Sequence, residues 1–437
     1  MMRQSSFFGF DITLFLATLV LMIVGVLFVY SSGVTSGGEV YSFEYTRQII
    51  WVSTGILILL GFALFNYNRL RGLSVYIYLG CIVLLIATLI IGHEVNGAKS
   101  WLGIGELGIQ PSEFMKIATI LVLANFLVFL GPRIRELQFF LLAFLIPLVP
   151  VLVILLQPDM GTALVYFPIF IVMVFLAGAK TRHIVFLLAT GLLTVMLSIM
   201  PSFERVLYGE TLVFFSIFGD QRILVLFLAS FLLIFLVSLW GHFVFKKKYF
   251  YWVGYVSLIM AISILGFLLA QRVLKDYQIM RLMIFLNPYI DPKGAGWNII
   301  QSVTAIGSGG FSGKGFLMGT QSHYNYLPQQ STDFIFSILA EEWGFIGGFL
   351  IILLYLVILL RGVRILTHAK DTFAIQIGAG IIAMIFFHVL VNIGMTMGIM
   401  PVTGIPLLLL SHGGSSLWTA SIGIGILLNI YMRRYNY

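Results

Sequence analysis

The sequence is poor in charged residues and contains a single cysteine. Only 10% of its 437 residues are Asp, Glu, Lys or Arg, and 60% are hydrophobic. Soluble domains carry about a quarter charged residues, so this composition and the mean hydropathy of +1.05 exclude an ordinary soluble protein. Cys81 lies in an apolar run and has no second cysteine with which to form a disulfide. We therefore expect an all-α, polytopic transmembrane helix bundle that forms one membrane domain over residues 1–437.

Several common signals are also missing. The apolar run Phe7 to Tyr30 is too long for the core of a signal peptide and lacks an A-x-A-like cleavage site, so we interpret it as a retained first span. Gly313-Lys314-Gly315 lacks the spacing and the preceding strand of a P-loop. No ligand spacing indicates a dedicated metal site. The carboxylates of Asp159 and Asp333 nevertheless leave a bound Mg²⁺ or Mn²⁺ open, and no other cofactor is expected.

Apolar runs of membrane-spanning length occur about twelve times. They lie at about 11–30, 48–66, 73–92, 114–131, 137–156, 162–178, 184–200, 222–245, 249–270, 335–361, 373–398 and 415–432. If the N-terminus is cytoplasmic, most Lys and Arg residues fall in short inner loops, so both termini are predicted to be cytoplasmic. The net charge of +8 then reflects membrane topology, and no nucleic-acid partner is expected.

Two segments between the spans are unusual. Residues 201–249 contain a further hydrophobic run that ends at Lys246 to Lys248, and we interpret them as an inserted helical hairpin. Residues 271–334 form the longest loop, which the topology places outside the cell. Aromatic and apolar residues throughout this loop, such as Trp297 and Phe311, indicate a folded rather than a disordered segment.

The stretch from Pro328 to Glu342 joins this loop to an apolar helix. Ser331 or Thr332 is a suitable N-cap, which would place Asp333 in the first helical turn, where the helix dipole favours an ionised carboxylate. Helical geometry then predicts one small and polar face, formed by Asp333, Ser337, Ala340, Glu341 and Gly344. An aspartate in a first turn is also ordinary helix-start chemistry. The acids of this face suit a protein interior or a water-filled cavity in a membrane.

Three other predicted helix starts on the same side of the membrane are polar. Gln110-Pro111-Ser112-Glu113 begins one, with Lys116 three residues after Glu113. Pro158 suits the first helical position of another, which places Asp159 in its first turn. Residues 401–416 contain two prolines and are expected to be a re-entrant segment, whose His412 to Ser416 turn could bind an anion. Ordinary caps, a local ion pair and a flexible turn would explain each feature separately. Together they predict an outer-face site for a polar-headed lipid or solute.

Several of these stretches resemble one family closely. They are NGAKSWL (96–102), IQPSEFMK (109–116), QPDMGT (157–162), NPYIDPKGAGWN (287–298), GKGFLMGTQ (313–321), LPQQSTDFIFSILAEEWGF (327–345) and NIGMTMGIMPVTGIPLLLLSHGGSS (392–416). At these residues the chain resembles the SEDS family of bacterial cell-wall polymerases (RodA, FtsW and SpoVE). The form PVTGIPL at 401–407 is typical of the elongation branch of that family.

The resemblance implies a peptidoglycan glycosyltransferase that polymerises lipid II at the outer face of the bacterial cytoplasmic membrane during elongation and cell-shape maintenance. It implies ten spans plus the inserted hairpin, a class B penicillin-binding protein as transpeptidase partner, and further membrane proteins of the elongation complex. Asp333 would be the catalytic base or would orient the attacking hydroxyl. The predicted substrate-binding residues are Lys99, Gln110, Glu113, Lys116, Asp159, Lys314, Gln330, Ser411, His412, Gly413, Gly414 and Ser415.

The chain departs from the family pattern at three positions. Gln329 and Ser331 stand where relatives often have Glu and His, and His412 stands where relatives have Tyr. Two other functions remain open. A lipid II flippase or transporter would also need a polar cavity, which intramembrane Lys116 and Glu341 fit, and a non-catalytic scaffold for wall-synthesis enzymes would need neither.

Overall fold

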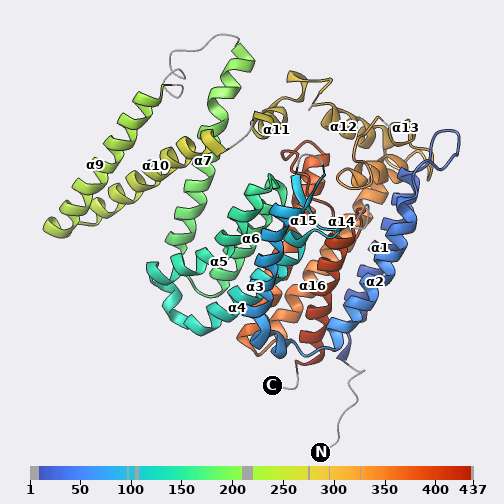
Figure 1. The fold of residues 1–437 in the computed structure, drawn as a ribbon, viewed down its shortest axis with the longest axis horizontal. Coiled ribbons are helices and arrows are strands. Elements are labelled where there is room, and N and C mark those ends of the chain that lie inside the picture. The colour runs from blue at the N-terminus through green and yellow to red at the C-terminus, as the bar shows by residue number, and fades with distance from the viewer. Residues whose placement is uncertain are drawn as a thin grey trace, which may run out of the picture. The chain divides into compact units, whose positions relative to one another are not determined.

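The computed structural model describes residues 9–95, 98–103, 108–208, 220–273, 276–294, 296–324 and 326–434, and Figure 1 shows their fold. These residues are mainly helical, with one antiparallel pair of short strands, β1 (His93–Val95) and β2 (Ala98–Trp101). The chain divides into two compact units. One comprises Met1–Ala179 and Asn298–Tyr437, and the other comprises Lys180–Trp297.

The first unit is a helix bundle. Its long helices are α1 (Ile12–Ser32), α2 (Glu44–Leu64), α3 (Tyr67–Ile91), α4 (Pro111–Leu130), α5 (Leu137–Leu156), α6 (Met160–Leu176), α14 (Ile335–His368), α15 (Thr372–Thr396) and α16 (Gly414–Met432). Helix α15 packs against α4, α6, α14 and α16, so it lies at the centre of the bundle. Shorter elements are the 3-10 turn Gly131–Arg135, α12 (Trp297–Gly309) and α13 (Thr320–His323).

The second unit contains α7 (Thr181–Tyr208), α9 (Gln221–Phe245), α10 (Lys248–Val273), α11 (Asp276–Leu286) and the 3-10 turn Pro288–Ile290. Helix α10 packs along α9 and α7. The predicted bounds of the inserted hairpin, 201–249, need correction. They begin inside α7, end inside α10 and contain only α9 as a complete helix, while residues 209–219 lie outside the described part. Lys246 has a left-handed φ of 53° and ends α9, so the Lys246 to Lys248 run turns the chain between two paired helices.

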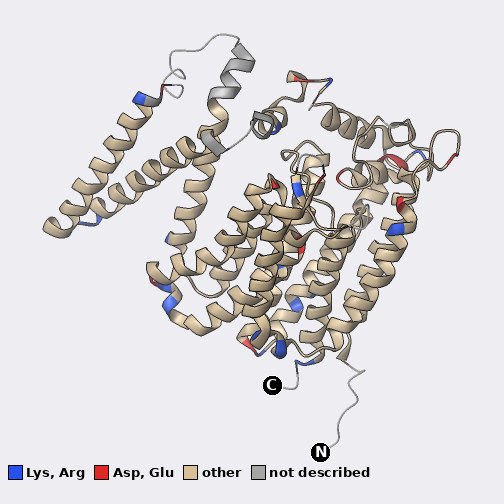
Figure 2. Ribbon diagram, in the orientation of Figure 1, with Lys and Arg blue, Asp and Glu red and all other residues tan. Residues whose placement is uncertain are grey.

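Eleven helices in the described residues are long and apolar enough to cross a membrane, and the shorter apolar helix α6 accounts for the remaining predicted run, 162–178. Figure 2 shows that most of the helical length carries no charge. The protein is therefore a multi-pass membrane protein with an all-α bundle, as predicted. Within the long loop, α11, α12 and α13 confirm that the loop is structured.

Helix α14 is interrupted near its start. Gly344 has φ 64° and ψ −160°, which breaks the predicted single helix of residues 335–361. A Cβ at this position would lie 2.3 Å from the backbone nitrogen of Gly313. The loop forms backbone hydrogen bonds with the helix at this break. The amide of Phe345 donates to the carbonyl of Gly310 (2.9 Å), and the amide of Gly315 donates to the carbonyl of Glu342 (2.9 Å).

Residues 401–413 are not helical, which confirms that they do not form a plain spanning helix. Leu407 to Leu410 are nevertheless buried. Side chains of the bundle satisfy their backbone, as buried carbonyls require: the Tyr355 hydroxyl donates to the carbonyl of Leu408 and the Gln48 amide to that of Ser411. We call residues 401–413 the buried segment.

Candidate functional site

Asp333 lies in a turn before α14, and not in its first turn as predicted. The helix begins at Ile335 with Phe334 as its N-cap, and no side chain caps it, so the predicted cap at Ser331 or Thr332 is also wrong. The physical reason is a competing turn: the carbonyl of Gln329, a residue with φ 54°, accepts the amide of Asp333 (3.1 Å). Asp333 is half-buried, and its Oδ2 faces the buried segment, 3.6 Å from where a Cβ on Gly404 would stand.

The backbone around Asp333 is tied to the buried segment. The amide of His412 donates to the carbonyl of Ser331 (2.9 Å). The side-chain Nδ2 of Asn392, on α15, donates to the carbonyls of both Asp333 (2.9 Å) and Ile405 (2.8 Å). Asn392 is fully buried and was not predicted as a site residue. Asp333 is therefore presented by a loop whose backbone is held from two directions.

Gln110 connects three of the predicted polar helix starts. Its backbone amide donates to Ser415 Oγ (2.9 Å) at the start of α16, and its Nε2 donates to Asp159 Oδ2 (2.8 Å) at the start of α6. Helix α6 begins at Met160 with Asp159 as its N-cap, so neither Pro158 nor Asp159 lies in the first turn as predicted. Asp159 accepts from the amide and the hydroxyl of Thr162 (3.0 and 2.8 Å). The starts of α4, α6 and α16 thus meet, as the sequence predicted.

The α6 start also reaches the buried segment. A Cβ on Gly161 would lie 2.2 Å from the carbonyl oxygen of Thr403, so the two backbones are in direct contact there. Gly404, the next residue, is the one beside the Asp333 carboxylate. The buried segment therefore links the Asp333 loop to the Gln110–Asp159–Ser415 cluster.

Glu113 and Lys116 form an ion pair inside the bundle. Lys116 Nζ lies 2.7 Å from Glu113 Oε1, with side-chain exposures of 0% and 3%. The same Nζ lies 3.0 Å from His388 Nε2, whose ring Nδ1 donates to the carbonyl of Pro406 (3.0 Å). A lysine in this environment is stable only with such partners. The predicted local pair is confirmed, and His388 joins it to the buried segment.

The turn before α16 is built from the other predicted residues. Ser411 Oγ accepts the amide of Leu407 (2.9 Å), and His412 Nδ1 donates to Gln48 Oε1 (3.1 Å). Burial lowers the pKa of His412, which favours its neutral form. Gly413 (φ 156°) is the N-cap of α16 and Gly414 its first residue, so the amides that begin this helix follow the turn directly.

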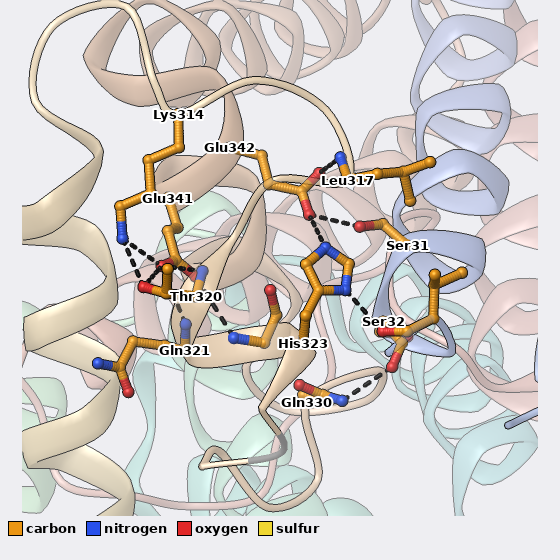
Figure 3. Close-up of polar contacts among 12 residues, drawn as sticks. Ser31, Ser32, Lys314, Leu317, Thr320, Gln321, His323, Gln330, Glu341 and Glu342 are labelled. Carbon is orange, nitrogen blue, oxygen red and sulfur yellow. Dashed lines mark hydrogen bonds and ion pairs between the residues drawn. The ribbon is translucent and has the colours of Figure 1, made fainter. Parts of the chain in front are cut away.

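Two other predicted residues, Lys314 and Gln330, make their described contacts in a separate network, which Figure 3 shows. Lys314 Nζ lies 2.7 Å from Glu341 Oε1, which also accepts the amides of Thr320 (2.8 Å) and Gln321 (3.0 Å) at the start of α13. Gln330 Nε2 donates to the carbonyl of Ser32 (2.8 Å) at the end of α1. These contacts fasten the long loop to α1 and α14.

Lys99 lies on β2, and its Nζ donates to the carbonyl of Ile90 (2.9 Å). This contact joins the strand pair to the end of α3, and it involves none of Gln110, Asp159 and Ser415. The described position of Lys99 therefore indicates a role in local structure.

The sequence analysis did not identify Glu342 and His323, which lie at the centre of the network that contains Lys314 and Gln330 (Figure 3). Glu342 accepts from the hydroxyl of Ser31 and the amide of Leu317 (3.2 Å), and its Oε1 lies 3.3 Å from His323 Nε2. His323 Nδ1 donates to the carbonyl of Val34 (2.6 Å). The Glu342 carboxylate raises the pKa of His323 against the opposing effect of burial. Two adjacent acids in an apolar helix were the only signal in the sequence.

Among the described residues, no three His, Cys, Asp or Glu side chains are grouped to hold a metal ion. Both oxygens of Asp159 accept hydrogen bonds from Thr162, and one accepts from Gln110 as well. Carboxylates that bind a metal also accept hydrogen bonds, so a cation at Asp159 or Asp333 stays a prediction.

Comparisons with known proteins cover nearly the whole chain. The family model described as "Cell cycle protein", that of FtsW, RodA and SpoVE, matches residues 12–210 and 211–436. The peptidoglycan glycosyltransferase RodA of Treponema pallidum is 49% identical over 434 residues, with 99% of this chain and 100% of the relative covered. The peptidoglycan glycosyltransferase MrdB of Escherichia coli K12 is 32% identical, with 97% and 94% covered.

Solved structures agree. A chain from the structure described as "Structural coordination of polymerization and crosslinking by a peptidoglycan synthase complex" is 26% identical, with 98% of this chain and 99% of that chain covered and a TM-score of 0.69. The crystal structure of the rod shape determining protein RodA of Thermus thermophilus, 24% identical with 98% of both chains covered, shares the fold with a TM-score of 0.60. The chain belongs to the FtsW, RodA and SpoVE family.

Proposed function

We propose that this protein is a peptidoglycan glycosyltransferase that polymerises lipid II during cell elongation. Relatives at 49% and 32% identity over nearly their full length are named peptidoglycan glycosyltransferases. The observation that carries the proposal is the placement of Asp333. Its half-buried carboxylate faces Gly404 of the buried segment. The same segment contacts the start of α6 and leads directly into α16.

In this reaction the 4-hydroxyl of one lipid II sugar attacks the anomeric carbon of the growing strand. A bond forms between that oxygen and the carbon, and the bond from the carbon to the polyprenyl diphosphate breaks. Asp333 accepts the hydroxyl proton or orients the hydroxyl for attack. Because the Asp333 backbone is held by Asn392, the carboxylate needs little reorganisation before it acts.

The leaving diphosphate requires positive groups. The free amides at the start of α16, at Gly414 and Ser415, suit its oxygens, since a helix N-terminus favours anions. Lys116 is fully buried and paired with Glu113, so we assign it a long-range electrostatic role. The Gln110–Asp159 contact keeps the α4 and α6 starts beside this position.

The proposed location is the bacterial cytoplasmic membrane, with both termini in the cytoplasm and Asp333 on the outer side. The partner would be a class B penicillin-binding protein, which would crosslink the strands, together with other membrane proteins of the elongation complex. The similarity to a chain of a peptidoglycan synthase complex that coordinates polymerization and crosslinking supports this choice. No nucleic acid is involved.

Strand formation from purified lipid II, with the transpeptidase partner present, tests the function. Wild-type protein is expected to form polymer, and Asp333→Asn, which keeps the shape but removes the basic carboxylate, is expected to lose about 10²–10⁴ in rate. The control Glu39→Gln removes an exposed carboxylate and should polymerise normally. A partner inactivated for polymerisation excludes its own contribution. Absence of polymer from the wild type would favour the flippase or scaffold alternatives, and near-normal rates with Asp333→Asn would reject the role of Asp333.

A further inference from the structure

Helix α15 carries two buried polar side chains one turn apart, His388 and Asn392. Their residue exposures are 1% and 0%. Residues four apart on a helix share one face. A polar group this deeply buried is costly to leave without partners, so the contacts it makes decide where it and its partners lie.

Both side chains donate to neighbouring carbonyls of the buried segment. Asn392 Nδ2 donates to the carbonyl of Ile405 (2.8 Å), and His388 Nδ1 donates to the carbonyl of Pro406 (3.0 Å). Pro406 has no backbone N–H with which to donate a hydrogen bond of its own. The two donations from α15 therefore fix consecutive carbonyls of a segment that has left-handed Gly404 just before them.

Each side chain also contacts a residue to which the proposed function assigns a role. Asn392 Nδ2 donates to the carbonyl of Asp333 (2.9 Å), and His388 Nε2 lies 3.0 Å from Lys116 Nζ. A lysine ammonium can only donate, so His388 Nε2 must accept and the ring hydrogen must be on Nδ1. The donation from Nδ1 to Pro406 requires the same tautomer, so both contacts of the ring agree.

We propose that His388 and Asn392 are positioning residues, which are anchored on the consecutive carbonyls of Ile405 and Pro406 and set the places of Lys116 and the Asp333 backbone. This inference rests on the proposed function for its catalytic consequence, but its geometric part stands without it. Since α15 carries both residues, it fixes the loop that holds Asp333 and the ammonium group of Lys116 relative to each other. Displacement of a reacting group by about 1 Å can cost about 10²-fold in rate.

The first experiment does not depend on activity. The ¹⁵N chemical shifts of histidine-labelled protein in lipid bilayers report the tautomer of each of the seven histidines. The His388 signals are identified by their loss in His388→Gln. The expected result is a neutral ring protonated on Nδ1. A ring protonated on Nε2, or an imidazolium, would overturn the proposed contacts even if the protein proved not to be a polymerase.

The second experiment measures polymerisation rate and lipid II affinity separately. Asn392→Leu is expected to lower kcat by about 10²-fold while the Kd for lipid II stays unchanged, because the lost contacts hold Asp333 and Ile405 and not the α16 start proposed to bind the diphosphate. His388→Leu is expected to lower kcat/KM by about tenfold or more, by the same reasoning. His388→Gln should restore most of this loss, because its amide can donate to Pro406 and accept from Lys116.

Val391→Ala is the matched control. Val391 is buried beside Asn392, so its truncation weakens packing without removing a polar contact. It should lower thermal stability but leave kcat per folded molecule unchanged. If Asn392→Leu does not accumulate, Asn392→Ser, whose hydroxyl can serve one of the two carbonyls, should show a smaller loss of the same kind.

Two results would overturn the positioning role. One is a normal kcat for folded Asn392→Leu together with a normal kcat/KM for His388→Leu. The other is a parallel loss in Val391→Ala, which would indicate packing alone. A wild type that makes no polymer refutes the proposed function, and the tautomer measurement then decides the contacts separately.

Discussion

Buried charged side chains in the described bundle are paired, and most of the pairs join different elements. Glu341 meets Lys314 from the long loop, Glu342 meets His323, and Asp11 at the start of α1 meets Arg361 from α14. Removing one partner of such a pair leaves an uncompensated buried charge, which costs more than the net contribution of the pair. The effect of a substitution at these positions therefore depends on what remains opposite it.

The Glu113–Lys116 pair offers a test of this rule. Lys116→Met alone should destabilise the protein by about 3–5 kcal/mol, because Glu113 is left charged and buried. The double variant Glu113→Gln/Lys116→Met should recover most of that stability, since no charge remains unpaired. The free energy of unfolding in detergent, measured for the single and the double variant, tests both expectations. A double variant less stable than the single one would contradict the paired-charge explanation, and polymerisation by the stable double variant would show that Lys116 is dispensable for the reaction.

His323 predicts a dependence on pH. Its neighbours are Glu342 and Glu341 and the carbonyl of Val34, and they raise its pKa above the ordinary 6.5. A raised pKa in the folded state means that the ionised form is stabilised by folding. This contribution is complete below pH 6.5 and is lost as the pH rises through the folded-state pKa.

The unfolding temperature of the wild type relative to His323→Gln, followed from below pH 6.5 to well above it, measures this contribution. The difference should shrink as the pH rises. The control His368→Gln removes an exposed histidine on α14 and should show no such trend. A difference that grows with pH would contradict the assigned sign.

At the scale of elements, α14 and residues 310–316 of the long loop form one folding unit. The loop places backbone amides against the carbonyls of Glu341 (3.1 Å) and Glu342 (2.9 Å), and the break at Gly344 lets residues 310–316 approach. Only glycine adopts φ 64° with ψ −160° without strain. The kink and the loop therefore depend on each other.

Gly344→Ala is expected to destabilise this unit by at least about 1–3 kcal/mol, since the backbone conformation is strained and the new Cβ meets Gly313. Hydrogen exchange at the amides of Gly315 and Phe345, which bridge loop and helix, should accelerate. Gly80→Ala in α3, where a Cβ meets nothing within 4 Å, is the matched control and should be neutral or slightly stabilising. Unchanged exchange in Gly344→Ala would argue against the coupling.

At the scale of the whole molecule, the chain crosses the membrane many times, and its orientation determines where Asp333 acts. The positive-inside rule places Lys247 and Lys370 in the cytoplasm and the loop with Ser36 outside. Gln330, which precedes Asp333 by three residues, donates to the carbonyl of Ser32 at the C-terminal end of α1, so Ser36 reports the side of Asp333.

Single cysteines test this topology in a Cys81→Ser background, since Cys81 is the only native cysteine. In intact cells a membrane-impermeant thiol reagent should label Ser36→Cys and spare Lys370→Cys and Lys247→Cys, while all three react after lysis. Labelling of Lys247→Cys in intact cells would contradict the predicted sidedness of α9 and α10, and labelling of Lys370→Cys would contradict that of the bundle.

Local sequence alone determined the membrane class, most of the helices and the positions at which several of them begin. Long apolar runs must form helices in a bilayer because each backbone group needs a partner within the segment. Gln110-Pro111 and Asp159 mark helix starts because capping involves only neighbouring residues. Motifs such as IQPSEFMK likewise carried the family prediction, which the full-length relatives confirm.

Tertiary structure decided the details of the site, because those details depend on competition between distant partners. Local patterns predict Asp333 in a first helical turn, but the carbonyl of Gln329 closes an earlier turn around it. The burial of His388 and Asn392 could be expected from their apolar helix, but their partners, Pro406, Lys116 and the Asp333 carbonyl, come from three separate segments. A hydrogen bond depends on which groups folding brings within about 3 Å, and spacing along one helix does not contain that information.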